Sequence, residues 1–268
     1  MEALSFLAAP IVMCLILVGI HCYLGLHVLR RGVIFVDLSL AQVASLGSTV
    51  ALLFHFEHAS TGSYFISLAF TFIAAIYFAW GKNFEGIVSQ EVLIAIVYAF
   101  ASSMVILVVN SMAHGAEHIK EILIGKILWV TWSDVAKTAG IYSVVAAIHY
   151  FVRRPMFLAS SNKQKTNSLF WDFLFYALFG VVITSSVGIA GILLVFSFLV
   201  VPALLSMIFA RTIKGQLLLG WLIGLVLSLL GMFISFKFDL PAGAVLVTTF
   251  TVCALAVIPF SGKKTKLV

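Results

Sequence analysis

The chain has 268 residues, of which 63% are hydrophobic and 10% are charged, and its mean hydropathy is +1.18. Soluble domains contain about 45–50% apolar and about 25% charged residues, so this composition excludes a water-soluble globular protein. The formal net charge of +6 does not indicate nucleic-acid binding, because the basic residues occur singly or in short clusters between apolar runs.

Long apolar runs follow one another along the whole chain. A helix needs about 20 apolar residues to cross roughly 30 Å of hydrocarbon. The candidate spans are 4–29, 33–54, 62–80, 90–112, 134–152, 169–187, 192–210, 216–236 and 241–260. No basic leader precedes the first run, which is therefore expected to be a retained helix. The predicted fold is an all-α polytopic membrane protein with eight or nine transmembrane helices, forming one domain over residues 1–268.

Two segments do not fit the pattern of spans and short loops. The polar segment 153–168 is the longest linker and divides the chain into a five-helix part, 1–152, and a four-helix part, 169–268. Segment 120–132 is too short to span and too apolar for a free loop. We expect it to lie at the outer membrane interface, where Trp129 and Trp132 would be well placed, and it decides between eight and nine spans.

The basic residues predict the orientation. With the N-terminus outside, the inner loops contain Arg30, Arg31, Lys82, Arg153, Arg154, Lys163, Lys165, Arg211, Lys214, Lys263, Lys264 and Lys266. Only Lys120, Lys126 and Lys237 fall outside, and Lys137 lies near the start of a span. The positive-inside rule therefore places the linker 153–168 and the C-terminus in the cytoplasm.

The common motifs of soluble enzymes are missing. The sequence contains no GxxxxGK[ST] run, no HExxH and no GxSxG. ATP hydrolysis by a Walker-type loop on this chain is thereby excluded, and an intramembrane enzyme has no motif support. A transporter or channel component remains, so the polar groups within the spans become informative.

Asp37 lies inside the second predicted span. A carboxylate at a helix centre in lipid costs roughly 2.5–3.5 kcal/mol, so it normally faces a cavity or a partner. Helical spacing places Ala41, Ala44 and Ser48 on the face of Asp37, while an adjacent stripe is formed by Gln42, Ser45 and Thr49. This surface could line a pathway. Alternatively, Asp37 pairs with Arg30 or Arg31 near the inner surface.

Several histidines are candidate metal ligands. His21 and His27 lie in the first span, where a hydrogen-bonded packing role is the alternative. Two outer loops carry His55-Phe56-Glu57-His58 and His114-Gly115-Ala116-Glu117-His118, of which His55, His58, His114, Glu117 and His118 could gather a divalent cation. Neither spacing is specific, and solvated loop residues or contacts to a delivery protein are favoured over a metal site for these loops.

The seventh predicted span contains Pro202, which should break the helix. A short helix after the kink, carrying Leu205 and Ser206 and ending in Arg211 and Lys214, could dock into a cytoplasmic partner. The alternative is an ordinary kinked span. In the next span, Gly220 and Gly224 form a small-xxx-small pair that could seat a second subunit.

Four stretches taken together resemble the permease subunits of bacterial ABC importers for zinc, manganese or iron, over nearly the whole chain. They are Leu29–Gly47, Gln90–Ala99, Glu117–Gly125 with Ile127–Trp129, and Gly188–Ala203. The resemblance implies a homodimer in the bacterial cytoplasmic membrane with a central translocation path, two cytoplasmic ATPase subunits and an extracytoplasmic metal-binding protein. It implies no permanently bound cofactor, a divalent metal ion as cargo, and ATP on the partner subunits.

The same resemblance assigns a coupling role to residues 203–214 and matches Asp37 to an acid that many members follow, four residues later, with a histidine. Here position 41 is alanine and position 42 is glutamine. Asp37 alone would hold a metal weakly, which suits a conduit because the ion must also leave. His21 or His27 could supply the missing imidazole. Oxygen donors favour manganese and histidines favour zinc, so the metal stays open.

The function expected from these features is the membrane subunit of an ATP-driven importer that works by alternating access. The alternative is a self-sufficient ion-coupled carrier or channel that uses Asp37 as its coupling site.

Overall fold

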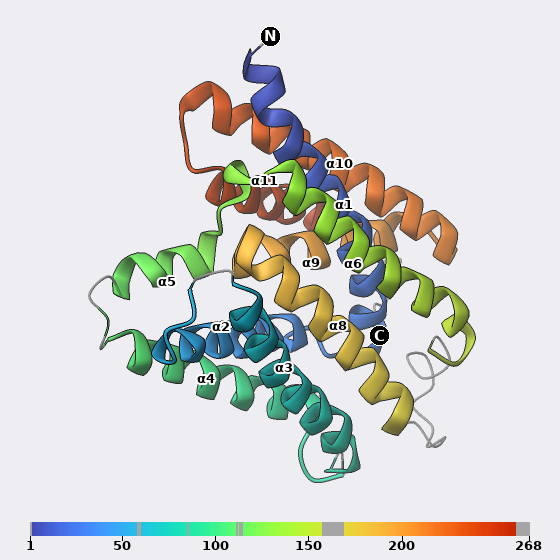
Figure 1. Cartoon of the computed structure of the whole chain (residues 1–268). Helices are drawn as coiled ribbons and strands as arrows, with labels where there is room; N and C mark the ends of the chain where they lie inside the picture. The colour runs from blue at the N-terminus through green and yellow to red at the C-terminus, as the bar shows by residue number, and fades with distance from the viewer. Residues whose placement is uncertain are drawn as a thin grey trace.

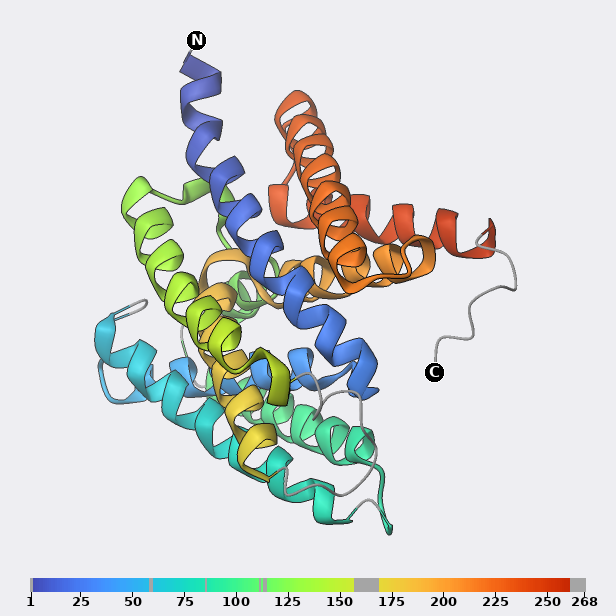
Figure 2. The ribbon, with the colours of Figure 1, turned by 90° about the vertical axis from the view of Figure 1, so that its right-hand side faces the viewer.

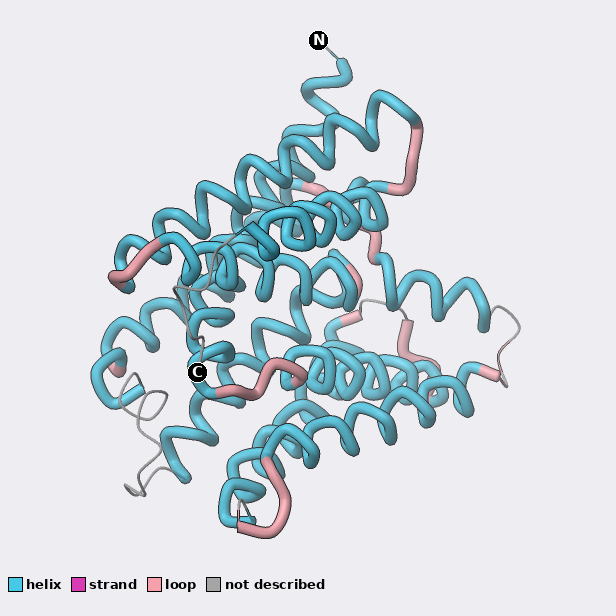
Figure 3. Tube along the Cα trace, turned by 180° about the vertical axis from the view of Figure 1, so that it is seen from behind, coloured by secondary structure: helices cyan, strands magenta, loops and turns pink. Residues whose placement is uncertain are grey.

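The computed structural model describes residues 2–57, 60–84, 86–110, 112, 115–156 and 169–260. These residues form helices joined by short loops, and none of them belongs to a strand (Figure 3). The α-helices are α1 (Glu2–Arg31), α2 (Val36–Leu53), α3 (Thr61–Gly81), α4 (Gln90–Val109), α5 (Gly115–Ile124), α6 (Trp132–Phe151), α8 (Leu169–Ala190), α9 (Ile192–Phe209), α10 (Ile213–Phe238) and α11 (Ala242–Val257). Three single 3₁₀ turns are η1 (Lys82–Phe84), η2 (Ile127–Trp129) and η3 (Ile258–Phe260). The predicted all-α class is confirmed.

Within the described ranges, eight helices are long and apolar enough to cross a membrane. They are α1 to α4 and α8 to α11, so at least eight of the eight or nine predicted spans have suitable helices. The helix α6 has 20 residues, which is long enough to span, but it is more polar than the other eight. Its sequence includes Asp134, Lys137 and His149.

The two parts of the sequence interleave in space. Helix α1 packs against α9 and α10 from the far end of the chain, and α8 packs against α2 and α3 (Figure 1). Helices α2, α3 and α4 form one group, and α1, α10 and α11 form another, with α8 and α9 between them (Figure 1). The five-helix and four-helix parts are therefore not separate bundles.

Small residues allow the helices to approach closely. Lipid tails are as apolar as leucine, so transmembrane helices associate through tight packing rather than through exclusion of water. A Cβ atom on Gly25 would collide with the carbonyl of Leu199, and one on Gly47 would collide with the backbone of Ser67. The α1–α9 and α2–α3 contacts therefore require glycine at these positions.

The pair Gly220 and Gly224 forms a close helix contact within the same chain. A Cβ on Gly220 would collide with Cys22, and one on Gly224 would collide with Val18, both on α1. The suggestion that this pair seats a second subunit is therefore wrong, because α1 of the same chain occupies that face of α10.

Segment 120–132 forms the end of α5, a turn and η2, and it does not add a span. The turn lies against the backbone of the α8–α9 junction, and a side chain on Gly125 would collide with the backbone of Ala190. Gly125 and Gly191 both have positive φ, which favours glycine at these two positions. The amide of Lys126 donates to the carbonyl of Ile189 at 2.9 Å. The α5–η2 turn is thus fixed against the junction between α8 and α9, and Trp129 and Trp132 remain exposed.

Candidate functional site

Asp37 is the second residue of α2 and is completely buried, with 0% of its surface exposed. Neither of its carboxylate oxygens has a hydrogen-bond partner within the described ranges. A buried carboxylate without partners is costly, and such groups in membrane spans mark functional sites. The position that follows one turn later, Ala41, is also buried, so the face beside the carboxylate is small.

The alternative pairing of Asp37 with Arg30 or Arg31 is not formed. Arg31 instead donates to Asp172 at the start of α8, with Nη1 and Oδ1 2.6 Å apart, and Arg30 donates to Gln216 on α10. Lys82 donates to the second oxygen of Asp172 at 2.9 Å. The guanidinium of Arg31 also lies 4.1 Å from the ring centroid of Phe175.

This network joins the ends of α1, α3 and α8, and sequence reasoning missed it. The three charged residues of this network, Arg31, Lys82 and Asp172, lie at the ends of three predicted spans. Their similar position relative to the membrane was the signal in the sequence that could have indicated the network. Because Arg31 and Asp172 are separated by 141 positions, helix spacing could not identify them as partners.

The polar stripe of α2 is buried along its length. Gln42, Ser45 and Thr49 are 7%, 3% and 0% exposed. Asp37 and Thr49 are 12 positions apart, which corresponds to about 18 Å along the helix axis. At the end of the stripe far from Asp37, His118 of α5 reaches α2, with Nε2 3.3 Å from the hydroxyl oxygen of Thr49. The stripe thus leads from near the buried acid to a contact with α5.

His21 and His27 lie in the interior, among aromatic and hydroxyl groups. His21 has both ring nitrogens within hydrogen-bond distance of protein oxygens: Nδ1 of the Leu17 carbonyl at 2.7 Å and Nε2 of the Ser186 hydroxyl at 3.1 Å. This arrangement corresponds to the packing role that was the alternative for His21. The ring of His27 stacks edge-on against Tyr23, with 4.9 Å between centroids.

The outer-loop candidates do not form one cluster among the residues that can be placed. His55 is exposed and has a φ of 62°, and Glu117 is exposed on α5. His58 and His114 lie outside the described residues. No group of three or more His, Cys, Asp or Glu side chains that could hold a metal occurs in the described part of the chain.

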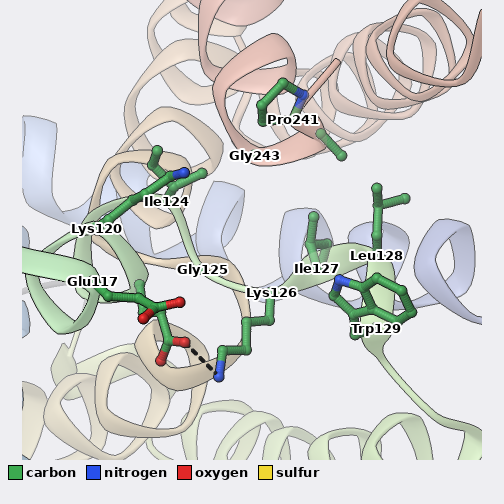
Figure 4. Close-up of a pocket in the computed structure, with 12 residues that line it drawn as sticks. Glu117, Lys120, Ile124, Gly125, Lys126, Ile127, Leu128, Trp129, Pro241 and Gly243 are labelled. Carbon is green, nitrogen blue, oxygen red and sulfur yellow. Dashed lines mark ion pairs between the residues drawn. The ribbon is translucent and has the colours of Figure 1, made fainter. Parts of the chain in front are cut away.

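A cavity of about 330 Å³ opens beside α5 (Figure 4). Its walls come from α5, the turn with η2 and the first residues of α11, including Glu117, Trp129 and Gly243. Lys126 forms an ion pair with Glu121 at 2.8 Å within it. The cavity therefore lies on the face of the protein that carries α5, and its walls include charged and aromatic side chains.

The segment after Pro202 differs from the expectation. Helix α9 continues through Pro202 to Phe209, so no separate short helix follows the proline. Leu205 and Ser206 are buried, and the Ser206 hydroxyl donates to the Ala203 carbonyl at 2.8 Å. Arg211 lies in the turn that joins α9 to α10, Lys214 lies in the first turn of α10, and both are exposed. The exposed part of the expected coupling segment therefore includes this turn and the start of α10.

Glu91 is a further site residue whose role sequence reasoning missed. It lies in the first turn of α4, and its Oε1 accepts a hydrogen bond from the amide of Phe35 at 3.1 Å. Phe35 directly precedes α2, and its side chain makes no capping hydrogen bond to the helix. Glu91 therefore caps the helix whose second residue is Asp37, from a different helix.

Comparison with protein families gives a match over residues 3–261 to the ABC 3 transport family. The chain belongs to this family. A "Probable iron transport system membrane protein" of Haemophilus influenzae is 22% identical over 250 residues, covering 91% of this chain and 86% of that protein. The "Manganese import system permease protein ScaB" of Streptococcus gordonii is 26% identical over 190 residues, covering 68% of this chain and 67% of the relative.

The ABC 3 transport fold is also found in solved structures. PsaBC from Streptococcus pneumoniae in complex with Fab has a TM-score of 0.78 at 19% identity, covering 95% of this chain and 92% of the other. An inward-facing conformation of a metal-chelate type ABC transporter has a TM-score of 0.71 at 16% identity, with coverages of 94% and 85%. This member of the ABC 3 transport family is thus a multi-pass membrane protein with the fold of ABC transporter permeases.

Proposed function

We propose that this chain is the transmembrane subunit of an importer that moves a divalent transition metal into the cytoplasm. Its family and the names of its relatives, which refer to iron and manganese transport, support this function. The single observation that carries the proposal within the molecule is Asp37, a buried acid without a protein partner in the described ranges, beside the polar stripe of α2. A passing cation would compensate its charge.

The oxygen donors along α2 favour manganese as the transported ion. Carboxylate, amide and hydroxyl oxygens come from Asp37, Gln42, Ser45 and Thr49, and such hard donors suit Mn²⁺. His21, which would favour zinc, already has both nitrogens in hydrogen-bond contacts with Leu17 and Ser186. A path with one carboxylate followed by neutral oxygens also holds the ion weakly enough to release it.

The partners belong to the same proposal. Two copies of the chain would enclose the path, and ATP would be hydrolysed on two separate cytoplasmic subunits. The exposed turn with Arg211, together with Lys214 at the start of α10, offers these ATPases a basic contact. With the N-terminus outside, the cavity beside α5 faces the outer side and offers Glu117 and Trp129 to an extracytoplasmic metal-binding protein.

Uptake measurements test the cargo and the energy source together. Cells that make the complete transporter should accumulate radioactive manganese, with iron competing and zinc competing less well. A substitution of the Walker lysine in the partner ATPase should abolish this uptake. Uptake that persists with the disabled ATPase would contradict the proposal and favour an ion-coupled carrier.

A further inference from the structure

A groove runs along the outside of α1, between α6 and α10. Figure 2 shows α1 passing between these two helices. The side chains of the three helices leave a groove with a volume of about 520 Å³. Its lining is mostly apolar and includes Ile16, Ile20, Leu217 and Trp221, together with the small residues Gly19 and Ala146. The indole N–H of Trp221 donates to the Gly19 carbonyl at 2.9 Å, which fixes the ring as one wall.

The polar end of the groove coincides with the end of α6. Arg153 lines the groove there and is exposed, and its guanidinium lies 4.6 Å from the ring centroid of Tyr150. His149 also lines this end and is 2% exposed, with Nδ1 3.1 Å from the Val145 carbonyl. The groove therefore combines an apolar channel with the accessible cation of Arg153 at its end.

The length of the groove suits an extended chain. From Ala139 to Arg153 the groove follows α6 and the residues after it for 14 positions, or about 20 Å at the rise of a helix.

The length also matches the geometry of one bilayer leaflet. A bilayer is about 40–45 Å thick with its headgroups, so a single leaflet measures about 20 Å. Arg153 lies at the end of α6 that the basic residues assign to the cytoplasm, and Ala139 lies toward the middle of the helix. An acyl chain in the groove would therefore extend from the headgroup level toward the midplane.

We propose that the groove between α1, α6 and α10 binds one anionic phospholipid of the inner leaflet. Its phosphate lies on Arg153, and one acyl chain runs along Ile20, Leu217 and Trp221. Basic pockets between transmembrane helices on the cytoplasmic side are suited to anionic headgroups. The lipid fills a groove that α1 and α10 leave open, and it connects α6 to the part of the molecule that carries the basic turn after α9.

The test is to count the lipids that remain on the purified transporter by native mass spectrometry. The protein is exchanged into nanodiscs that contain equal amounts of phosphatidylglycerol and phosphatidylcholine, then released for measurement. We expect one retained phospholipid per chain, with phosphatidylglycerol preferred about fivefold, the factor that roughly 1 kcal/mol per basic residue provides. Equal retention of both lipids, or none, would overturn the proposal.

Matched variants locate the site. Arg153→Gln should reduce the preference for phosphatidylglycerol to about one, whereas Arg154→Gln, at an exposed position outside the groove, should leave it unchanged. Ala146→Phe should remove the retained lipid, because the added ring fills the groove, and Ala147→Phe on the neighbouring exposed position should not. A lipid count that Ala146→Phe does not change would contradict this location. Disulfide formation between two copies carrying Ala146→Cys would show that a second copy covers the groove and would reject the proposal.

Discussion

Two aspartates, Asp37 and Asp172, are buried near the start of their helices, yet their surroundings differ completely. Asp172 is 1% exposed and receives Arg31 at 2.6 Å and Lys82 at 2.9 Å. Asp37 is 0% exposed, and its oxygens have no hydrogen-bond partner among the described residues. Arg31 is much nearer to Asp37 in sequence, but it binds Asp172. The comparison separates a carboxylate that holds helices together from one that is left available for a cation.

The paired aspartate should give the largest effect on stability. Removal of one partner from a buried ion pair costs about 3–5 kcal/mol, because the remaining charges are left uncompensated. We therefore expect Asp172→Asn to lower the free energy of unfolding by this amount, as measured by thermal and denaturant unfolding in detergent. A triple variant with Arg31→Gln, Lys82→Gln and Asp172→Asn should recover part of the loss. If Asp172→Asn is as stable as the natural protein, the contrast between the two aspartates is wrong.

An imidazole one turn from Asp37 should change the metal preference. Ala41 lies on the face of Asp37, so Ala41→His places an acid and a histidine at the spacing of a two-ligand site. Because imidazole favours zinc, we expect zinc to compete for manganese uptake about tenfold more strongly. Ala44→His, one turn further from Asp37, is the matched control and should change the competition less. Equal effects of the two substitutions would argue against an ion at Asp37.

The cap on α2 should give a smaller effect. Loss of a helix N-cap costs about 0.5–2 kcal/mol, so Glu91→Ala should lower the free energy of unfolding within this range. Glu91→Gln keeps an oxygen that can accept from the Phe35 amide and should lose less. The apparent affinity for the transported metal should weaken with the alanine variant, because the cap positions the turn that carries Asp37. An unfolding curve that neither substitution shifts would mean that α2 does not depend on this cap.

The sequence predicts the helices well because each apolar run is a local feature. The expected spans 62–80 and 216–236 correspond to Thr61–Gly81 and Ile213–Phe238. Asp37 was identifiable because a charge inside an apolar run stands out in the sequence alone. The choice of Asp172 as the partner of Arg31 was not predictable, because it depends on how α1 and α8 pack.

Two local signals also gave wrong expectations for the same reason. Pro202 should end a helix, but α9 continues through it, because neighbouring helices can accommodate the missing amide. Gly220 and Gly224 indicated a close helix contact correctly, but the partner is α1 of the same chain. A sequence shows that a residue needs a neighbour, whereas the fold decides which neighbour it has.

The most direct test of Asp37 as the cation-binding acid is to measure manganese uptake and unfolding for the same variant, Asp37→Asn. Loss of this ligand should lower uptake at least about tenfold. The free energy of unfolding should stay equal or rise, because a buried charge without a protein partner is removed. Uptake at the natural rate, or a loss of stability as large as that of Asp172→Asn, would contradict the account.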